Sequence, residues 1–339
     1  MKNISLVGFG RIGRDLFRQS IEEINTNIIS VSDIADKDNL VYLLKYDSIY
    51  GPLKATVTDT PNGISVNGKE TIFNDWKDAG QSDWNSINTD IVVLATGKQQ
   101  NKAEALKHLD KGAKKIIIAS TPEDMKDIDV FIPGANDESI DFTKSIISLG
   151  SNTANASAPV IKIINEAIGV ERAFINTIHG YSNSNRLADV TGEGFRQNRA
   201  AGENIIPSKT SSSIVIEKAL PFLKNKITST SMTVPVPDGS IVDLTIDVKK
   251  KTPAEKINKI IEENISSKFI SQRIGITYDP IVSSDVVGNS LSGLIDGRST
   301  MDIDEKKIKI LIWFDNGWGY SSRILETIKI YQEEIKANE

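Results

Sequence analysis

Two α/β domains are predicted by three features of the sequence. A glycine-rich turn at 8–13 lies between a short β-prone run and a segment with helical apolar spacing. Near-continuous apolar runs follow at 90–95 and 115–119, as is typical of strands buried on both faces of a parallel sheet. After Gly150 the runs become longer and alternate, which favours a mostly antiparallel sheet with helices on one face.

The turn after Gly150 separates the predicted domains. We expect the first domain over residues 1–150 and the second, an α+β domain, over residues 151–319. A C-terminal helix over 320–339 is expected to pack back on the first domain. The chain has 339 residues, 39% hydrophobic and 25% charged, which is enough for two domains and ordinary for a soluble globular protein.

Composition excludes several classes of function. The net charge of −5 gives no electrostatic reason to expect a nucleic acid or an anionic membrane as partner. The absence of cysteine excludes disulfides, thiolate metal sites and thiol catalysis, and no other metal-ligand spacing is present, so no metal is expected. No apolar run is long enough to span a bilayer and no signal peptide is evident, so we expect a cytoplasmic protein.

The N-terminal glycine turn has the spacing of a dinucleotide-binding motif. Gly8 permits the tight turn, Gly10 lets the backbone approach a pyrophosphate, and Gly13 allows close helix–strand packing. The next strand ends at Asp33, where a carboxylate meets the ribose hydroxyls and repels a 2′-phosphate. A plain strand-turn-helix is the alternative, but the combination favours a Rossmann domain that binds NAD rather than NADP.

Two polar turns follow later strands of the first domain. Thr96-Gly97 and Ser120-Thr121-Pro122 fall just past predicted strand ends, the edge where ligands bind in open α/β sheets. His108 lies among charged residues of a predicted helix over 101–111, so we expect it on the solvated surface.

The turn at 151–159 joins a strand-like run to a helical pattern. Its small polar residues place hydroxyls and backbone N–H groups at a helix N-terminus, which favours an anion site. Thr210-Ser211-Ser212-Ser213 begins another predicted helix and is a second candidate. The residue at the position suited to a nucleophile is Asn152, an amide.

The second domain contains a candidate acid/base and a long polar loop. His179 ends a β-run, where it is either catalytic or hydrogen-bonded structure. Arg186 and Arg199 lie in the loop at 182–202 and suit phosphate or carboxylate, or else salt bridges at the surface. The turn at 315–320 follows a strand and precedes the last helix, so a turn that caps this helix would explain its sequence without a functional role. Expected strands are 172–178, 229–236, 240–248 and 307–314, and expected helices are 208–220, 254–264 and 322–336.

Six segments match the motifs of one enzyme family in the same order. They are 8–14, 43–48, 151–159, 179–183, 204–207 and 313–321. On these segments the chain resembles the glyceraldehyde-3-phosphate dehydrogenase family along essentially its whole length. The resemblance implies a homotetramer in which the loop from Tyr181 to about Gly202 lines the cofactor site of a neighbouring subunit.

The resemblance also implies roles for individual residues. His179 would be the acid/base, and Asn152 occupies the nucleophile position without being a nucleophile. NAD would be bound by Gly8, Gly10, Arg11, Ile12, Gly13, Asp33, Thr96, Gly97, Ser120, Asn183 and Asn316. Substrate or inorganic phosphate would be bound by Ser151, Thr153, Ser182, Arg186, Arg199, Thr210, Ser211 and Thr233.

The departures from the family pattern concern the chemistry. The catalytic cysteine of the family falls at Asn152 and its second cysteine at Ala156. Thr233 stands where the family has an arginine, and Ser211 where glycine is usual. Gln99 and Gly317 replace an aromatic and an acidic residue. An amide cannot attack an aldehyde, so phosphorylating glyceraldehyde-3-phosphate dehydrogenase activity is expected to be absent or residual.

Three hypotheses remain. The favoured one is an NAD-dependent oxidoreductase acting on a small phosphorylated aldehyde, ketone or polyol, in which His179 moves the proton and the Asn152 amide orients the oxygen. The second is a catalytically disarmed paralogue that binds NAD or a sugar phosphate. The third is a true dehydrogenase carrying an engineered Cys-to-Asn change, against which Ala156 and Thr233 argue because they indicate wider divergence.

Overall fold

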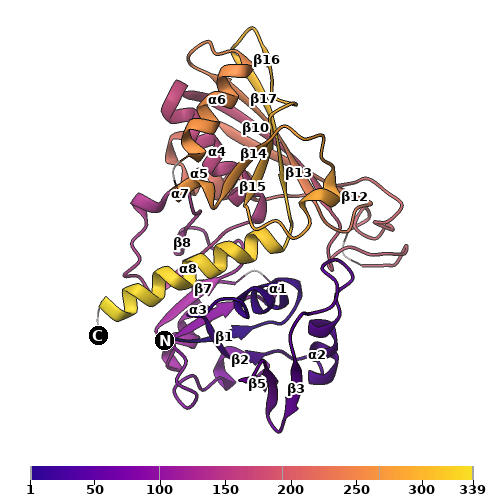
Figure 1. The fold of residues 1–339 in the computed structure, drawn as a ribbon, viewed down its shortest axis with the longest axis vertical. Coiled ribbons are helices and arrows are strands. Elements are labelled where there is room, and N and C mark those ends of the chain that lie inside the picture. The colour runs from indigo at the N-terminus through magenta and orange to yellow at the C-terminus, as the bar shows by residue number, and fades with distance from the viewer. Residues whose placement is uncertain (1, 99, 193, 267, 338–339) are drawn as a thin grey trace. The chain divides into compact units, whose positions relative to one another are not determined.

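The computed structural model describes residues 2–98, 100–192, 194–266 and 268–337 (Figure 1). The chain divides into two compact units. Unit 1 consists of Met1–Phe131, Ser139–Gly150 and Ser321–Glu339, and unit 2 of Ile132–Glu138 and Ser151–Tyr320. The segment 132–138 therefore groups with the second unit although it precedes Gly150, and most of the C-terminal helix groups with the first.

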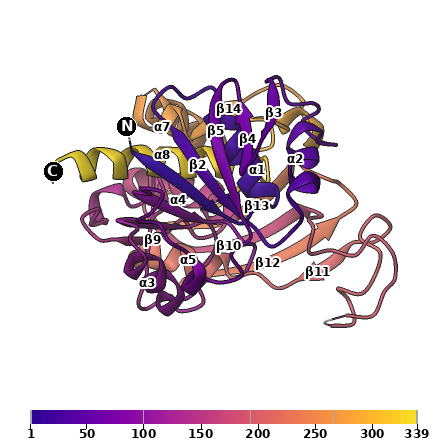
Figure 2. The same ribbon diagram turned by 90° about the horizontal axis from the view of Figure 1, so that it is seen from below.

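Unit 1 is built on a sheet in the order β3-β4-β5-β2-β1-β6-β7-β9-β8. Its parallel strands include β6 and β7, in which every residue is buried, as the continuous apolar runs predict. β3, β4 and β5 form an antiparallel edge that joins the parallel part through β2, and β2, β5 and β4 lie side by side in Figure 2. The strands are β1 (Asn3–Val7), β2 (Asn27–Ser32), β3 (Val57–Thr60), β4 (Gly63–Val66), β5 (Lys69–Asn74), β6 (Ile91–Leu94), β7 (Lys115–Ile118), β8 (Asp129–Val130) and β9 (Ile146–Ser148).

The helices of unit 1 begin where the chain leaves a strand end. α1 spans Arg11–Ser20 and starts directly after the glycine turn. α2 spans Lys37–Lys45, and α3 spans Lys102–Asp110 behind its cap Asn101, whose side chain accepts from the Glu104 N–H. α8 spans Trp318–Ala337, and the part from Ser321 onward belongs to this unit. Among the described residues, no helix combines the length and the apolar character needed to cross a membrane.

Unit 2 carries a mostly antiparallel sheet in the order β11-β12-β10-β13-β17-β15-β14, with β16 paired to β17. Along β13 and β17 buried and partly exposed residues alternate, so one face of the sheet forms the core with α4. The strands are β10 (Val170–Gly180), β11 (Ile206–Ser208), β12 (Ile227–Val234), β13 (Ser240–Val248), β14 (Ile274–Thr277), β15 (Gly293–Asp296), β16 (Met301–Ile303) and β17 (Lys307–Phe314). The helices are α4 (Asn152–Ile168), α5 (Ser212–Ala219), α6 (Ala254–Ile265) and α7 (Lys268–Ser271).

Several element predictions were wrong at their boundaries, among them the starts of α1 and α5. The helix expected after the turn at 8–13 begins inside that turn, at Arg11, because Gly10 already takes the N-cap position. The helix expected from residue 208 begins at Ser212, because residues 206–208 pair with β12 as the edge strand β11. Between Gly180 and Ile206 the described residues form neither a helix nor a strand, and this segment extends away from the sheet of unit 2 in both views (Figures 1 and 2).

Candidate functional site

The glycine turn of unit 1 combines tight packing with one open position. Gly8 has a φ of 93°, and a Cβ there would lie 2.6 Å from the carbonyl oxygen of Ala95. A Cβ on Gly13 would lie 2.3 Å from the carbonyl oxygen of Gly8, whereas a Cβ on Gly10 would meet nothing within 4 Å. Gly8 and Gly13 therefore allow the turn to close, and Gly10 leaves space beside the N-terminus of α1 for an anion.

Asp33 is fixed beside this turn by backbone donors. The Phe9 N–H donates to its Oδ2 at 2.7 Å and the Ala35 N–H to its Oδ1 at 2.9 Å. The carboxylate thus joins the end of β2 to the turn after β1. This is the position at which a carboxylate reaches the hydroxyls of a bound adenosine ribose.

The glycine turn and Asp33 both line a cavity of about 580 Å³ in unit 1. Its volume lies within the range of small-molecule sites. Trp76 and Trp84 form an edge-to-face pair in its wall, with ring centroids 4.9 Å apart. Gly8, Gly10, Asp33, Ile34 and Thr96 also line it. The cavity accordingly presents apolar and aromatic surface next to a fixed carboxylate and the open glycine.

Thr96, Gly97 and Ser120 follow the carboxyl ends of β6 and β7, as predicted. The Thr96 hydroxyl oxygen accepts from the Gln100 side-chain amide at 2.9 Å, and Gly97 has a φ of 72°. The Ser120 hydroxyl faces the Lys98 carbonyl at 3.5 Å. Gln99, which departs from the family pattern, lies outside the described residues.

His108 is not on the solvated surface, so that prediction was wrong. It is 5% exposed, and its Nδ1 accepts a hydrogen bond from the Trp84 indole N–H at 3.1 Å. Burial lowers its pKa to about 4, so the ring is neutral at physiological pH. The charged neighbours in sequence mislead because successive residues of a helix point to different faces.

The first turn of α4 in unit 2 satisfies its own donors. The hydroxyl of the N-cap residue Ser151 accepts from the Ala154 N–H at 3.1 Å. The side-chain oxygen of Asn152 accepts from the Thr153 N–H at 2.8 Å. The predicted helix N-terminus is present, but side chains already occupy two of its backbone donors.

Asn152, His179 and Asn316 come together in unit 2. The Asn152 amide nitrogen donates to the Asn316 carbonyl at 3.0 Å and lies 3.4 Å from Nε2 of His179. His179 Nδ1 lies 2.6 Å from the Gly180 carbonyl oxygen, which can only accept, so Nδ1 carries the proton. Because the Asn152 amide nitrogen can only donate, Nε2 is the acceptor of this contact and the ring is neutral.

Asn316 is held in place and retains one unused donor. Its side-chain oxygen accepts from the Ser240 hydroxyl, and its backbone N–H donates to Oδ1 of Asp238 at 2.9 Å. Within the described part of the chain its Nδ2 has no hydrogen-bond partner although the residue is 6% exposed. A buried amide donor without a partner is uncommon in folded proteins.

A chain of hydroxyl groups joins the N-termini of α4 and α5. The Ser212 hydroxyl lies 3.2 Å from that of Ser151 and 2.8 Å from that of Thr210. Ser211 takes the N-cap position of α5, and Thr153 is buried beside Ser151. The sequence indicated residues 210–213 as a group but did not single out Ser212, which connects the two helices.

The remaining residues expected to bind phosphate make other contacts. Thr233 is 6% exposed, and its hydroxyl lies 3.2 Å from that of Ser208. Arg199 is exposed and forms an ion pair with Asp189 at 2.9 Å. The Ser182 hydroxyl lies 2.8 Å from that of Ser184, while Asn183 and Arg186 are exposed on the same loop. No group of acidic, histidine or cysteine side chains suited to a metal ion occurs in the part of the chain described.

The fold of the two units is that of a dinucleotide-binding domain followed by an α+β domain. Residues 2–102 match the family model of the glyceraldehyde 3-phosphate dehydrogenase NAD binding domain, and residues 151–316 match that of the C-terminal domain. The chain therefore belongs to the glyceraldehyde-3-phosphate dehydrogenase family. The predicted α/β fold, the Rossmann domain and NAD as cofactor are confirmed.

Relatives match over nearly the full length of the chain. Glyceraldehyde-3-phosphate dehydrogenase of Geobacillus stearothermophilus is 37% identical over 324 residues, which cover 95% of this chain and 96% of the relative. Glyceraldehyde-3-phosphate dehydrogenase 2 of Streptomyces avermitilis is 38% identical over 325 residues, with the same coverage of both chains. The enzyme of Borreliella burgdorferi is 37% identical over 329 residues, 95% of this chain and 97% of the relative.

Proposed function

We propose that the chain is an NAD-dependent oxidoreductase that interconverts a small phosphorylated polyol with its aldehyde or ketone and forms no thioester. The observation that carries this proposal is the neutral His179, whose Nε2 faces the nucleophile position while its Nδ1–H is anchored on Gly180. A carbonyl–alcohol reaction requires a proton acceptor at this position and no nucleophile. Asn152 cannot attack, but its amide can donate to a substrate oxygen.

The proposed step uses groups already in place. NAD, when bound, supplies the hydride acceptor. His179 takes the hydroxyl proton of the alcohol at Nε2, and the Gly180 carbonyl stabilises the resulting imidazolium through Nδ1–H. The hydride leaves the carbon as the proton leaves the oxygen, so the alcohol becomes a carbonyl. Asn152 turns its amide N–H from His179 to the substrate oxygen and keeps its bond to Asn316.

Nicotinamide absorbance tests this function directly. Purified protein is incubated with NAD or NADH and a panel containing glyceraldehyde 3-phosphate, dihydroxyacetone phosphate, erythrose 4-phosphate and glycerol phosphates. We expect turnover without added phosphate, and a loss of at least about a hundredfold in His179→Ala, the usual contribution of a general base. A fold check by thermal unfolding accompanies each variant. No turnover with any member of the panel would reject the proposal.

The hydroxyl chain supports binding of the substrate phosphate. Ser151, Ser212 and Thr210 offer O–H donors between two helix N-termini, where a phosphate is favoured electrostatically. Thr233 adds no charge, so this phosphate site is weaker than one with an arginine. Ser212→Ala should raise KM for the phosphorylated substrate, with little effect on kcat.

The cavity of unit 1 supports binding of the adenosine half of NAD. Asp33 would accept from the ribose hydroxyls and exclude a 2′-phosphate, and the Trp76 side chain would contact the adenine side of the cavity. We expect NAD to quench tryptophan fluorescence, and Trp76→Phe to remove most of the quenching. Asp33→Asn should weaken NAD binding about tenfold or more and reduce discrimination against NADP. Trp313→Phe, a change in unit 2, is the matched control.

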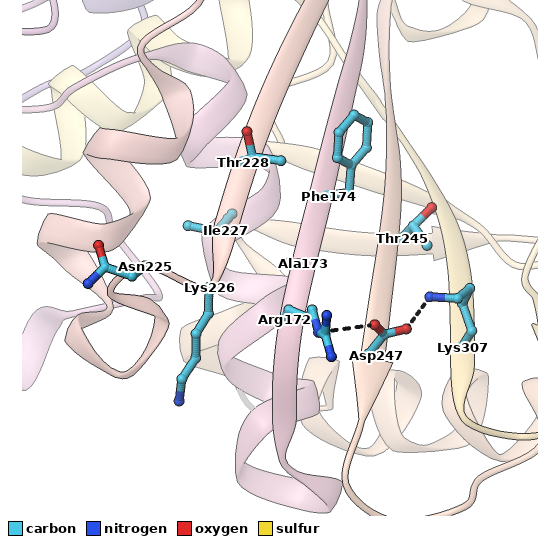
Figure 3. Close-up of a pocket in the computed structure, with 10 residues that line it drawn as sticks. All are labelled: Arg172, Ala173, Phe174, Asn225, Lys226, Ile227, Thr228, Thr245, Asp247 and Lys307. Carbon is cyan, nitrogen blue, oxygen red and sulfur yellow. Dashed lines mark hydrogen bonds and ion pairs between the residues drawn. The ribbon is translucent and has the colours of Figure 1, made fainter.

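A homotetramer is supported by the outward face of the unit 2 sheet. On this face Phe174 of β10 is 44% exposed and Met232 of β12 is 37% exposed, so both could be buried by a neighbouring subunit. On the same face Asp247 pairs with both Arg172 and Lys307 (Figure 3). Light scattering should give four times the chain mass of 37.2 kDa. Phe174→Asp should lower that mass.

One observation favours the alternative of a disarmed binding protein. The amide of Asn152 bonds to Asn316, His179 and Thr153 at once, so the nucleophile position is filled by a group whose polar atoms are all in use. In that case NAD raises the unfolding temperature while the full substrate panel gives no turnover. Activity that appears only in Asn152→Cys would decide for this alternative.

A further inference from the structure

Lys115, the first residue of β7, is a buried lysine of unit 1 that takes no part in the proposed function. It is 6% exposed, whereas a lysine usually keeps its ammonium group in water. The preceding residue Lys114 shows the usual arrangement, with a side chain that is 50% exposed and an ion pair to Asp90 at 2.9 Å. The Lys115 ammonium must therefore have partners inside the chain.

Three backbone carbonyl oxygens surround the Lys115 ammonium. Its Nζ donates to the carbonyls of Phe142 and Thr143, both at 2.8 Å, and to that of Lys144 at 3.1 Å. These three residues are consecutive and lie just before β9, which pairs in parallel with β7. An ammonium group has three N–H groups, and each of them has a carbonyl acceptor here.

An aromatic ring completes the enclosure. Nζ lies 4.8 Å from the ring centroid of Tyr331 on α8, which is within the range of a cation–π interaction. Tyr331 is fully buried, and its hydroxyl donates to the Lys144 carbonyl at 3.1 Å, so the ring is fixed to the same loop. Three segments that are distant in sequence, β7, the loop 142–144 and α8, thus meet at one positive charge.

The contacts require the charged form of this lysine. A neutral amine has two N–H groups and could not donate to three carbonyls. Burial lowers the pKa of Lys115, while the charges of Glu334 and Asp141 act in the opposite direction and favour the ammonium. Carbonyl oxygens that replace a hydration shell are also the ligands by which proteins hold potassium. The enclosure therefore has the chemistry of a monovalent-cation site.

We propose that the carbonyls of residues 142–144 and the Tyr331 ring form a monovalent-cation site that the Lys115 ammonium occupies. Through this site Lys115 holds the loop before β9 and the C-terminal helix to β7. A free potassium or ammonium ion takes the same place when the lysine side chain is removed. The parent chain, whose site is filled, needs no free cation. The site is separate from the proposed function, and its test requires no turnover.

Two substitutions of Lys115 distinguish the cation site from the lysine side chain. Lys115→Ala leaves the position of Nζ open for an ion, whereas Lys115→Met fills most of the space with an uncharged chain of similar length. Both variants remove one positive charge. Lys114→Ala removes the same charge from the neighbouring exposed residue and is the matched control.

The first measurement is chemical denaturation of each variant in potassium, ammonium or choline chloride at equal ionic strength. In Lys115→Ala we expect potassium or ammonium to stabilise the folded chain, with an equilibrium constant of unfolding about tenfold lower when the ion is at about ten times its Kd. Choline, whose nitrogen is shielded by methyl groups, should have no such effect. The general effect of each salt is given by the parent chain, Lys115→Met and Lys114→Ala, which have no open site. If Lys115→Ala responds to the three salts as these chains do, the cation site is rejected.

The second measurement uses the parent chain and therefore still tests the site if Lys115→Ala does not fold. ¹⁵N NMR detects a lysine ammonium group when its protons exchange slowly with water. We expect a signal from Lys115 near neutral pH with exchange several-fold slower than that of Lys114, because all three of its N–H groups are buried and bonded. Lys115→Met assigns the signal. Exchange as fast as that of Lys114 would mean that Nζ is hydrated, and would overturn the proposed site.

Discussion

The first turns of α1 and α4 differ in what they leave for a ligand. α1 begins after Gly10, which has no side chain to cap the helix and leaves open space. α4 begins after Ser151, whose hydroxyl caps the helix, and its first residue Asn152 accepts from the next N–H. A helix N-terminus attracts an anion only as far as its donors are not already satisfied.

This difference separates the binding half of the chain from the chemical half. In unit 1 the cavity, the carboxylate of Asp33 and the open glycine fit the NAD that the family binds. In unit 2 the Asn152 amide nitrogen donates to the Asn316 carbonyl and lies 3.4 Å from Nε2 of His179. The two units therefore differ: unit 1 has open space beside a helix N-terminus, whereas in unit 2 the first side chain of α4 is already hydrogen-bonded.

The largest expected effect comes from restoring a thiol at the start of α4. Asn152→Cys would place a sulfur beside Nε2 of His179 at a helix N-terminus, both of which favour a thiolate. We expect iodoacetamide to modify it at pH 7 at least about tenfold faster than a cysteine at the exposed position Asn183. Because the chain has no cysteine, each variant carries a single thiol.

The double variant Asn152→Cys, His179→Ala tests the cause of this reactivity. Without the imidazole, the modification rate should fall toward that of Asn183→Cys. If Asn152→Cys reacts no faster than Asn183→Cys, the first turn of α4 does not activate a nucleophile. The two helices would then differ only in their N-cap residues, Gly10 and Ser151.

A second prediction concerns the buried histidine of unit 1. Because the folded pKa of His108 is lowered to about 4 from 6.5, the unfolded chain binds a proton first. Stability from the neutral ring is complete above about pH 6.5 and is lost as pH falls toward 4, by up to about 3 kcal/mol. His108→Gln keeps an acceptor for the Trp84 indole and should flatten this part of the profile of unfolding free energy against pH.

The pH profile also distinguishes the two units. In unit 2, burial and then the charge of Asp238 raise the pKa of the buried Asp315 to about 6, so the contribution of Asp315 to stability is complete below about pH 4 and is lost as pH rises to about 6, the opposite sign to that of His108. Asp238→Asn should therefore change the neutral side of the profile and His108→Gln the acidic side. A profile that His108→Gln leaves unchanged would mean that His108 is solvated after all.

The parts of the fold that the sequence predicts depend on local patterns. The bounds of β13 and β17 agree with the prediction because each is a long alternating run with one buried face. The glycine turn was predictable because spacing alone sets its geometry. The burial of His108 was not predictable from its neighbours, since it depends on Trp84, which lies 24 positions away in sequence. Thr233 likewise turns to Ser208 through the pairing of β11 and β12, which no local pattern indicates.

The smallest expected effect uses two glycines of the same turn to separate folding from binding. A Cβ on Gly13 would meet the Gly8 carbonyl oxygen at 2.3 Å, so Gly13→Ala must displace the backbone and should cost about 1–3 kcal/mol in unfolding free energy. A Cβ on Gly10 meets nothing, so Gly10→Ala should lose only the preference for glycine over alanine at an N-cap, about 0.5–1 kcal/mol. It should nevertheless weaken NAD binding, because its methyl group stands where the pyrophosphate approaches.

Chemical denaturation and NAD titration on the same two variants check this contrast. Gly10→Ala should unfold near the midpoint of the parent chain and bind NAD less tightly, whereas Gly13→Ala should unfold at lower denaturant. The same NAD affinity in Gly10→Ala and the parent chain would show that the open space at the start of α1 is not used by the cofactor. The only remaining difference between the two helix N-termini would then be that Ser151 caps α4 with its side chain and Gly10 does not cap α1.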